Sequence, residues 1–217
     1  MSYSVKEIYY TLHGEGHLSG RPATFLRFSG CNLWSGREED RKSAICKFCD
    51  TDFVGFDGRN GGKYQTGDEL AKAVDENWPS EHAMSARKLV VLTGGEPLLQ
   101  LDLELVDALH RLNFEIAVET NGTVENPSGL RWRIYWLCVS PKAGTELKIK
   151  SGNEIKLVYP QENFDPSLFC DLDFNHHYLQ AMDGPNQKQN TQLAIQYCLE
   201  NPMWSLSVQT QKIIGLN

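Results

Sequence analysis

The sequence contains no long apolar run, and this absence excludes a membrane-spanning helix. Its 217 residues include no stretch of about 18 or more apolar residues, the length that a helix needs to cross a bilayer. The segment from Met1 to Glu7 also lacks the apolar core of a secretory signal. We therefore expect a cytoplasmic protein without a membrane partner.

Positive charge and cysteine are also scarce. Lys and Arg total 21 against 28 Asp and Glu, which gives a net charge of −7. Because tight non-specific binding to nucleic acid needs a basic surface, we expect no direct nucleic-acid partner. Six cysteines are too few for a disulfide scaffold in a chain of this length. Clustered cysteines in a reducing compartment are typical of metal or catalytic sites.

Short β-rich apolar segments alternate with helical patterns along the chain. A capping box at Thr66 and Glu69 predicts a helix over 67–78. Asp102 can cap a second helix, and a third fits 191–200. Several strand candidates are nearly continuous apolar runs, which is typical of strands covered on both faces. Strands are expected at residues 24–28, 88–92, 115–119, 134–139, 154–159, 178–182 and 206–208.

The alternation of strands and helices implies parallel β/α units. About six or seven strands accompany only about three helices, which is too few helices for a full eight-unit barrel. We therefore predict an α/β fold, a partial, reduced (β/α) TIM-like barrel of mostly parallel strands in a single domain over 1–217. A polar, glycine-rich insertion at about 30–62 interrupts the pattern, and such insertions are usually functional or disordered.

Three cysteines, Cys31, Cys46 and Cys49, have the spacing C-x14-C-x2-C. A structural zinc site normally has four protein ligands, and the available fourth ligands (His13, His17 or a distant cysteine) lack zinc-finger spacing. A redox C-x2-C pair needs no third cysteine. A [4Fe–4S] cluster held by three thiolates keeps one iron open for a substrate or cofactor. These three interpretations remain open on spacing alone.

The other cysteines, Cys138, Cys170 and Cys198, are expected to have no ligand role. Cys138 lies in an apolar run and Cys198 on the core side of a predicted helix. A free buried cysteine behaves as a small apolar residue.

An apolar strand runs directly into Thr93-Gly94-Gly95-Glu96-Pro97. Ligands gather at the carboxyl ends of strands in parallel β/α folds, and glycines let a ligand approach the backbone closely. Glu96 can accept hydrogen bonds from a cationic amine. The alternative interpretation is an ordinary strand-to-helix turn in which Pro97 opens the next segment.

The cysteine cluster followed by Gly-Gly-Glu-Pro resembles the radical S-adenosylmethionine (SAM) superfamily, whose usual motif is C-x3-C-x2-C. The expanded first gap resembles one small family within it, the 7-carboxy-7-deazaguanine synthases. The resemblance covers nearly the whole chain, through residues 10–16, 25–34, 46–53, 93–97, 119–122, 139–142, 180–184 and 207–217. It implies ring contraction of 6-carboxy-5,6,7,8-tetrahydropterin to 7-carboxy-7-deazaguanine with loss of ammonia, in 7-deazapurine and queuosine biosynthesis.

The resemblance also implies cofactors and partners. A [4Fe–4S] cluster would be bound by Cys31, Cys46 and Cys49, with SAM on the open iron. Chemistry would come from a cofactor-derived radical rather than from an acid or base side chain. A flavodoxin-like protein would donate the electron, and the enzyme would be a homodimer. The matching SAM contacts are Phe48, Cys49, Asp50, Gly95, Glu96, Ser140, Pro141, Lys142, Gln180, Ala181, Met182 and Asp183.

Thr51 matches a family position that binds Mg²⁺, an ion that prefers hard oxygen ligands. The alternative interpretation is that Thr51 is an ordinary hydroxyl residue in a turn. Arg27 lies in an apolar strand and needs an anionic partner. That partner is either a structural carboxylate such as Glu15 or, as the resemblance implies, the substrate carboxylate. Glu119 and Asn121 are expected to line the same cavity. The substrate contacts implied are Leu12, His13, Gly14, Glu15, Arg27, Thr93 and Asn217.

The chain departs from the family pattern at three positions. His13 stands where glutamine is common, and Gln211 where the tail commonly has histidine. The chain has Asn217 where the family tail often ends in a proline whose carboxylate reaches the substrate. Two other functions stay open, namely a radical enzyme that acts on a peptide and a zinc-stabilised binding module.

Overall fold

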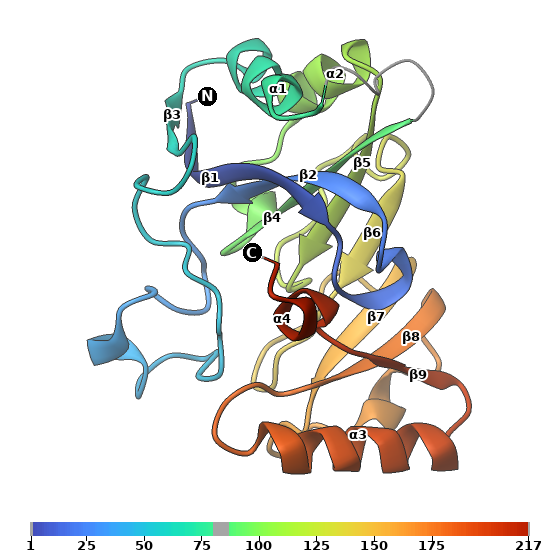
Figure 1. The fold of residues 1–217 in the computed structure, drawn as a ribbon. Helices are drawn as coiled ribbons and strands as arrows, with labels where there is room; N and C mark the ends of the chain where they lie inside the picture. The colour runs from blue at the N-terminus through green and yellow to red at the C-terminus, as the bar shows by residue number, and fades with distance from the viewer. Residues whose placement is uncertain (1, 80–86, 217) are drawn as a thin grey trace.

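A computed structural model describes residues 2–79 and 87–216. Nine strands of this part of the chain form one sheet in the order β3-β1-β2-β4-β5-β6-β7-β8-β9 (Figure 1). The strands are β1 (Tyr3–Leu12), β2 (Pro22–Phe28), β3 (Gly62–Tyr64), β4 (Lys88–Gly94), β5 (Phe114–Thr120), β6 (Trp136–Val139), β7 (Ser151–Tyr159), β8 (Asp173–Ala181) and β9 (Trp204–Ser207).

Seven of these strands, β2 and β4 to β9, run parallel and neighbour one another in chain order. They correspond to the seven predicted segments, with ends that differ by a few residues. The sheet is open, with β3 and β9 at its two edges. The prediction of an α/β fold with a partial barrel of mostly parallel strands is therefore confirmed.

Strands β1 and β3 were not predicted, and a bulge explains why β1 is hard to recognise. β1 pairs antiparallel with β2 on one side and with β3 on the other. The register shifts between Val5 and Glu7, so Tyr3, Val5 and Ile8 reach the same core despite their uneven spacing. A bulge moves apolar side chains out of the two-residue period by which strands are recognised.

The helices are α1 (Gly67–Glu76), α2 (Leu103–Arg111), α3 (Gln187–Glu200) and α4 (Thr210–Ile214). The first three were predicted, whereas the short α4 was not. Helices α1 and α2 pack together at one end of the molecule, and α3 packs on β7, β8 and β9 at the other (Figure 1). None of the helices in the described residues has the length and apolar character needed to cross a bilayer.

The parallel strands direct alternate side chains to two faces. One face packs in the main core and includes Leu26, Val90, Ile116, Leu137 and Ile155. On the other face, Leu18 packs against apolar side chains near the strand starts, Ala23, Leu89, Val91 and Ala117. Further along this second face the side chains are polar and include Arg27, Thr93, Glu119, Lys156 and Gln180. The carboxyl ends of the strands therefore carry a polar surface.

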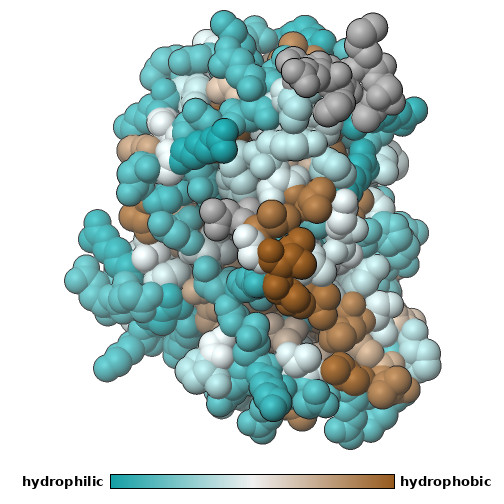
Figure 2. Space-filling model, in the orientation of Figure 1, coloured by the Kyte–Doolittle hydropathy of each residue, from teal (hydrophilic) through white to brown (hydrophobic). Residues whose placement is uncertain are grey.

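The insertion between β2 and β3 projects from the sheet and contains one short 3-10 turn, η2 (Glu38–Asp40) (Figure 1). Lys6 of β1 anchors the later part of this insertion, because its ammonium donates to the carbonyl of Val54 at 2.9 Å and pairs with Asp52 and Asp57. This projection has a hydrophilic surface, whereas apolar side chains gather in a band near α4 and β9 (Figure 2). Exposed apolar residues of that C-terminal segment are Val208, Ile213, Ile214 and Leu216.

The start of α2 gives a testable prediction about stability. Asp102 caps α2 by accepting from the N–H of Leu105 at 3.0 Å, and it also accepts from the hydroxyl of Tyr3 at 2.7 Å. We expect Asp102→Ala to lower the free energy of unfolding by about 2 kcal/mol, because a cap and a side-chain hydrogen bond are lost together. Urea unfolding measures this change. Asp171→Ala, at an exposed aspartate, is the matched control, and equal stability of the two variants would contradict the prediction.

Candidate active site

A cavity of about 390 Å³ opens at the carboxyl ends of the parallel strands. This is the edge where parallel β/α folds bind their ligands. The cavity wall includes Glu119 and Asn121, as expected from the sequence. It also includes most of the predicted site residues, namely Leu12, His13, Gly14, Glu15, Arg27, Cys31, Cys46, Phe48, Cys49, Asp50, Thr51, Thr93, Gly95, Ser140, Lys142, Gln180, Ala181 and Asp183.

Three predicted site residues, Glu96, Pro141 and Met182, are not among the described residues that line this cavity, and a fourth is not described. Glu96 is fully buried, and its carboxylate accepts hydrogen bonds from within the chain at 2.7–3.0 Å. Pro141 and Met182 each lie next to residues that line the cavity. Asn217 lies outside the described residues. The binding roles of these four residues stay predictions.

The three clustered cysteines meet at the cavity although two of them come from the insertion. Cys31 follows β2, and Cys46 and Cys49 approach it from the far end of the loop. All three thiols are free. The thiol of Cys46 donates a hydrogen bond that lowers the pKa of Cys49 to about 6, against the effect of burial. The lowered pKa favours the thiolate of Cys49, which is the form that binds metals.

Arg41 fastens the expanded loop beside the C-x2-C turn. Its guanidinium donates to the carbonyl oxygens of Lys47 and Cys49 at 2.9 and 3.1 Å. The same group lies 4.0 Å above the ring of Trp34 and pairs with Glu38. The long segment between Cys31 and Cys46 therefore contains the residue, Arg41, that holds the C-x2-C turn in place.

Gly95 lies where only a glycine fits. A Cβ atom at this position would stand 1.9 Å from the carbonyl oxygen of Gly30 and 2.9 Å from the Cβ of Cys31. The β4 strand end therefore packs directly against the backbone that carries the first cysteine. This close approach accounts for the Gly-Gly sequence at the strand end.

Two more strand ends bring polar groups to the same wall. Lys142 donates to the hydroxyl of Ser140 at 2.8 Å, and burial lowers the pKa of its ammonium. On β8, Gln180 accepts a hydrogen bond from Ser207 at 3.2 Å. Cys138 is buried as predicted, but it also lines the cavity. Sequence reasoning had treated it as part of an ordinary core run.

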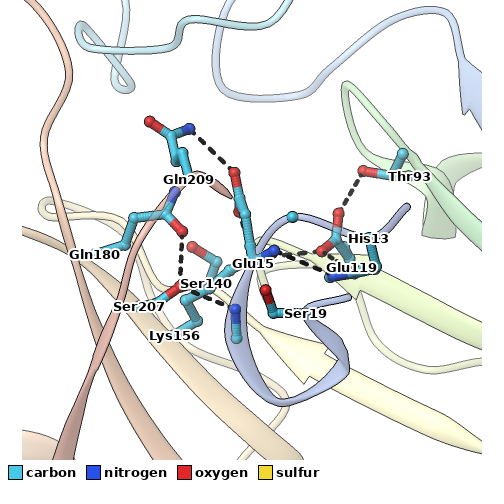
Figure 3. A network of polar contacts seen from close by, with 12 residues as sticks. His13, Glu15, Ser19, Thr93, Glu119, Ser140, Lys156, Gln180, Ser207 and Gln209 are labelled. Atoms are coloured by element: carbon cyan, nitrogen blue, oxygen red, sulfur yellow. Dashed lines mark hydrogen bonds and ion pairs between the residues drawn. The ribbon is translucent and has the colours of Figure 1, made fainter. Parts of the chain in front are cut away.

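A chain of charged side chains crosses the floor of the cavity (Figure 3). The ammonium of Lys156 lies 2.6 Å from Glu15 and 3.3 Å from Glu119. Glu119 also accepts from the hydroxyl of Thr93 at 3.0 Å and lies 3.4 Å from Nε2 of His13. Lys156 was absent from the predicted site, although it is a charged residue in the middle of an apolar strand.

The carboxylate partner of Arg27 is Glu7, not Glu15. Nε of Arg27 donates to Glu7 at 2.8 Å, and its terminal nitrogen donates to the hydroxyl of Tyr9 at 3.0 Å. Arg27 nevertheless faces the cavity. A guanidinium has further N–H groups, so this side chain can still bind an anion there.

The C-terminal tail closes one side of the cavity. Thr210 donates to the carbonyl of Gly14 through both its backbone N–H and its hydroxyl, each at 2.9 Å. Gln209 and Gln211 donate to Glu15 at 3.0 and 3.2 Å. A second set of contacts joins Lys212 to the carboxylates of Asp50 and Asp183. The tail thus links the loop after β1, the cysteine insertion and the end of β8.

The donor set fits an iron–sulfur cluster. Three free thiols from two segments line one cavity, and the pKa of Cys49 favours its thiolate. Among residues 2–79 and 87–216, no compact group of three His, Cys, Asp or Glu side chains could hold a single metal ion. A [4Fe–4S] cluster does not need three side chains that close together, because each thiolate binds a different iron of the cluster.

Comparison with known proteins agrees with this site. No family model matches the chain. It is 57% identical over 219 residues to 7-carboxy-7-deazaguanine synthase of Caulobacter vibrioides and 56% identical over 216 residues to that of Bradyrhizobium diazoefficiens, with 100% of each chain covered. The crystal structure of QueE from Escherichia coli matches with a TM-score of 0.67 and 27% identity, over 97% of this chain and 95% of that chain. The chain belongs to the 7-carboxy-7-deazaguanine synthase family.

Proposed function

We propose that this protein is a radical SAM lyase that converts 6-carboxy-5,6,7,8-tetrahydropterin to 7-carboxy-7-deazaguanine and ammonia, in 7-deazapurine and queuosine biosynthesis. Full-length identity of 57% to a relative named for this product supports the reaction. The observation that carries the proposal is that Cys31, Cys46 and Cys49 line one cavity together with the charged groups of its floor. Thiol ligands and polar substrate contacts thus share one space.

The cofactors of this proposal are a [4Fe–4S] cluster and SAM. Cys31, Cys46 and Cys49 hold the cluster, and when bound the two groups supply the radical that removes hydrogen from the substrate. The chain contributes position and shielding. Arg41 keeps the C-x2-C turn in place, and the close packing of Gly95 keeps the β4 end beside Cys31. SAM contacts come from Phe48, Asp50, Gly95, Ser140, Lys142, Gln180, Ala181 and Asp183, all in the cavity wall.

The substrate lies, in this proposal, over the polar floor. The free N–H groups of Arg27 bind the substrate carboxylate, because a guanidinium matches that group in shape and charge. Glu15 and Glu119 accept from N–H groups of the pterin ring. Gln211 donates to Glu15 at 3.2 Å and so helps to fix the direction of that carboxylate. The tail that carries it limits access of water.

Magnesium belongs to the same proposal. Thr51 lines the cavity between two aspartates of the insertion, Asp50 and Asp52. Mg²⁺ prefers oxygen ligands and keeps several waters, so one threonine oxygen and the substrate carboxylate suit it. Its charge would help Arg27 to orient that carboxylate.

Partners and location complete the proposal. The enzyme takes its electron from a flavodoxin-like donor and works as a homodimer in the cytoplasm. The six free cysteines suit a reducing compartment. The net charge of −7 favours a small-molecule substrate over direct contact with nucleic acid.

The reaction is tested under anaerobic conditions. Protein reconstituted with iron and sulfide is incubated with the tetrahydropterin, SAM and dithionite, and chromatography follows 5′-deoxyadenosine and 7-carboxy-7-deazaguanine. We expect both products from the native chain and neither from Cys31→Ala, because three thiolates are needed to hold the cluster. Cys170→Ala, away from the cavity, is the matched control and should behave as the native chain.

Two outcomes count against this function. Formation of 5′-deoxyadenosine without the deazaguanine would point to a radical enzyme with another substrate. Reconstituted protein that stays colourless near 400 nm and binds zinc instead would favour a zinc-stabilised module.

The magnesium site gives a separate prediction. Thr51→Ala should raise the Mg²⁺ concentration needed for half-maximal activity by about tenfold, because an oxygen ligand is lost. Activity is titrated with Mg²⁺ at fixed substrate and SAM. Thr191→Ala on α3 is the matched control. If the Mg²⁺ dependence of Thr51→Ala is unchanged, the Thr51 hydroxyl does not bind Mg²⁺ and has only a structural role in the turn.

A further inference from the structure

One ammonium lies between two carboxylates on the cavity floor, and they come from three separate parts of the chain (Figure 3). Lys156 lies on β7, Glu119 on β5, and Glu15 in the loop after β1. The Lys156 side chain is 7% exposed, and those of Glu15 and Glu119 are 20% and 23% exposed. A contact this buried is strong, because little water screens it.

We propose that Lys156 is a positioning residue for the reaction, whose ammonium holds Glu15 and Glu119 side by side as hydrogen-bond acceptors for the ring N–H groups of the pterin. This inference rests on the proposed function, because it takes its ligand from there. Lys156 itself needs no contact with the substrate. Its role is to fix the direction and the charge of the two groups that do.

Each carboxylate keeps acceptor capacity toward the cavity. Glu15 accepts from Lys156 with one oxygen and from two tail amides with the other. Glu119 accepts from Thr93 with one oxygen and from Lys156 with the other. An ionised carboxylate has about four acceptor positions, so both groups can take a further donor. Both line the cavity, and a pterin edge rich in N–H groups matches this paired arrangement.

His13 completes the arrangement on the same side. Its Nδ1 accepts from the backbone N–H of Glu15 at 3.3 Å, which leaves the proton of the neutral ring on Nε2. Nε2 lies 3.4 Å from Glu119. In this tautomer Nε2 presents its N–H to one of the two carboxylates.

The charge of Lys156 also decides whether both carboxylates stay ionised. Burial alone would raise the pKa of Glu119 and of Glu15, but the ammonium holds both below their usual range. In turn the carboxylates hold the pKa of Lys156 above its usual range against burial. Without the ammonium, two close carboxylates would share a proton. The other titratable groups that face this set are Tyr9, His13, Cys138, Lys142 and Glu154.

Lys156→Met tests the inference through the pH dependence of stability in the full chain without substrate. In the native protein both carboxyls have depressed pKa values, so their ionised forms stabilise the fold above about pH 4.3. That stabilisation is lost as the pH falls further. In the variant one carboxyl has a raised pKa, so the variant loses stability as pH rises. The gap in Tm between the two proteins should widen by about 4 °C between about pH 5 and pH 8.

Two further variants make the measurement specific. Glu119→Gln combined with Lys156→Met removes one carboxylate with the ammonium, so its Tm gap to the native chain should change with pH less than that of Lys156→Met, because only burial then raises the pKa of Glu15. Lys148→Met, at an exposed lysine, is the matched control for loss of one positive charge. If the Tm difference between the native chain and Lys156→Met is the same at every pH, the inference is overturned and Lys156 is only a packing residue.

Turnover provides the second readout. Lys156→Met should raise the KM for the pterin by about tenfold near pH 6.5 and by less near pH 8.5, where the shared proton dissociates. Lys156→Arg keeps the charge and should keep the pH dependence of the native KM. An equal rise of KM at both pH values would also overturn the inference. A native chain that forms no product would reject the proposed function, while the Tm measurement still decides the role of Lys156.

Discussion

The ion pairs of Lys156 with Glu15 and Glu119 are the contact on which the interior of the cavity depends. They join β7, β5 and the loop after β1, and that loop also receives the tail through Gly14. If this contact is broken, a buried charge loses its partner, which is costly. The floor, the loop and the tail therefore form one connected unit, and the thiol-bearing insertion joins it through Asp50.

The parallel sheet was predictable because its constraints are local. Leu89 to Leu92 form a continuous apolar run because the strand packs against the helix layer on one face and Leu18 on the other. Thr66 and Asp102 each cap the helix that their sequence predicts. The bulge in β1 and the short α4 have no comparable local pattern. They depend on contacts with distant segments, and sequence reasoning missed both.

The same distinction separates the parts of the site. The cysteine spacing and the Gly-Gly strand end are local, and the structure brings Cys31 and Gly95 together. Lys156 was missed because a lysine in a strand is read by default as facing solvent. Its position in an apolar run between Ile155 and Leu157 was the available signal, since both neighbours face the core. Arg41 gave no such signal, because its partners are backbone carbonyls of an irregular loop.

Two departures from the family pattern, His13 and Gln211, each contact one of the two carboxylates that pair with Lys156. His13 presents Nε2 to Glu119, and Gln211 donates its amide N–H to Glu15. Where the family commonly has glutamine and then histidine, this chain has histidine and then glutamine. An imidazole and a primary amide can each present an N–H group to a carboxylate. Each carboxylate of this chain therefore faces one such group, and the imidazole is the one on the buried floor.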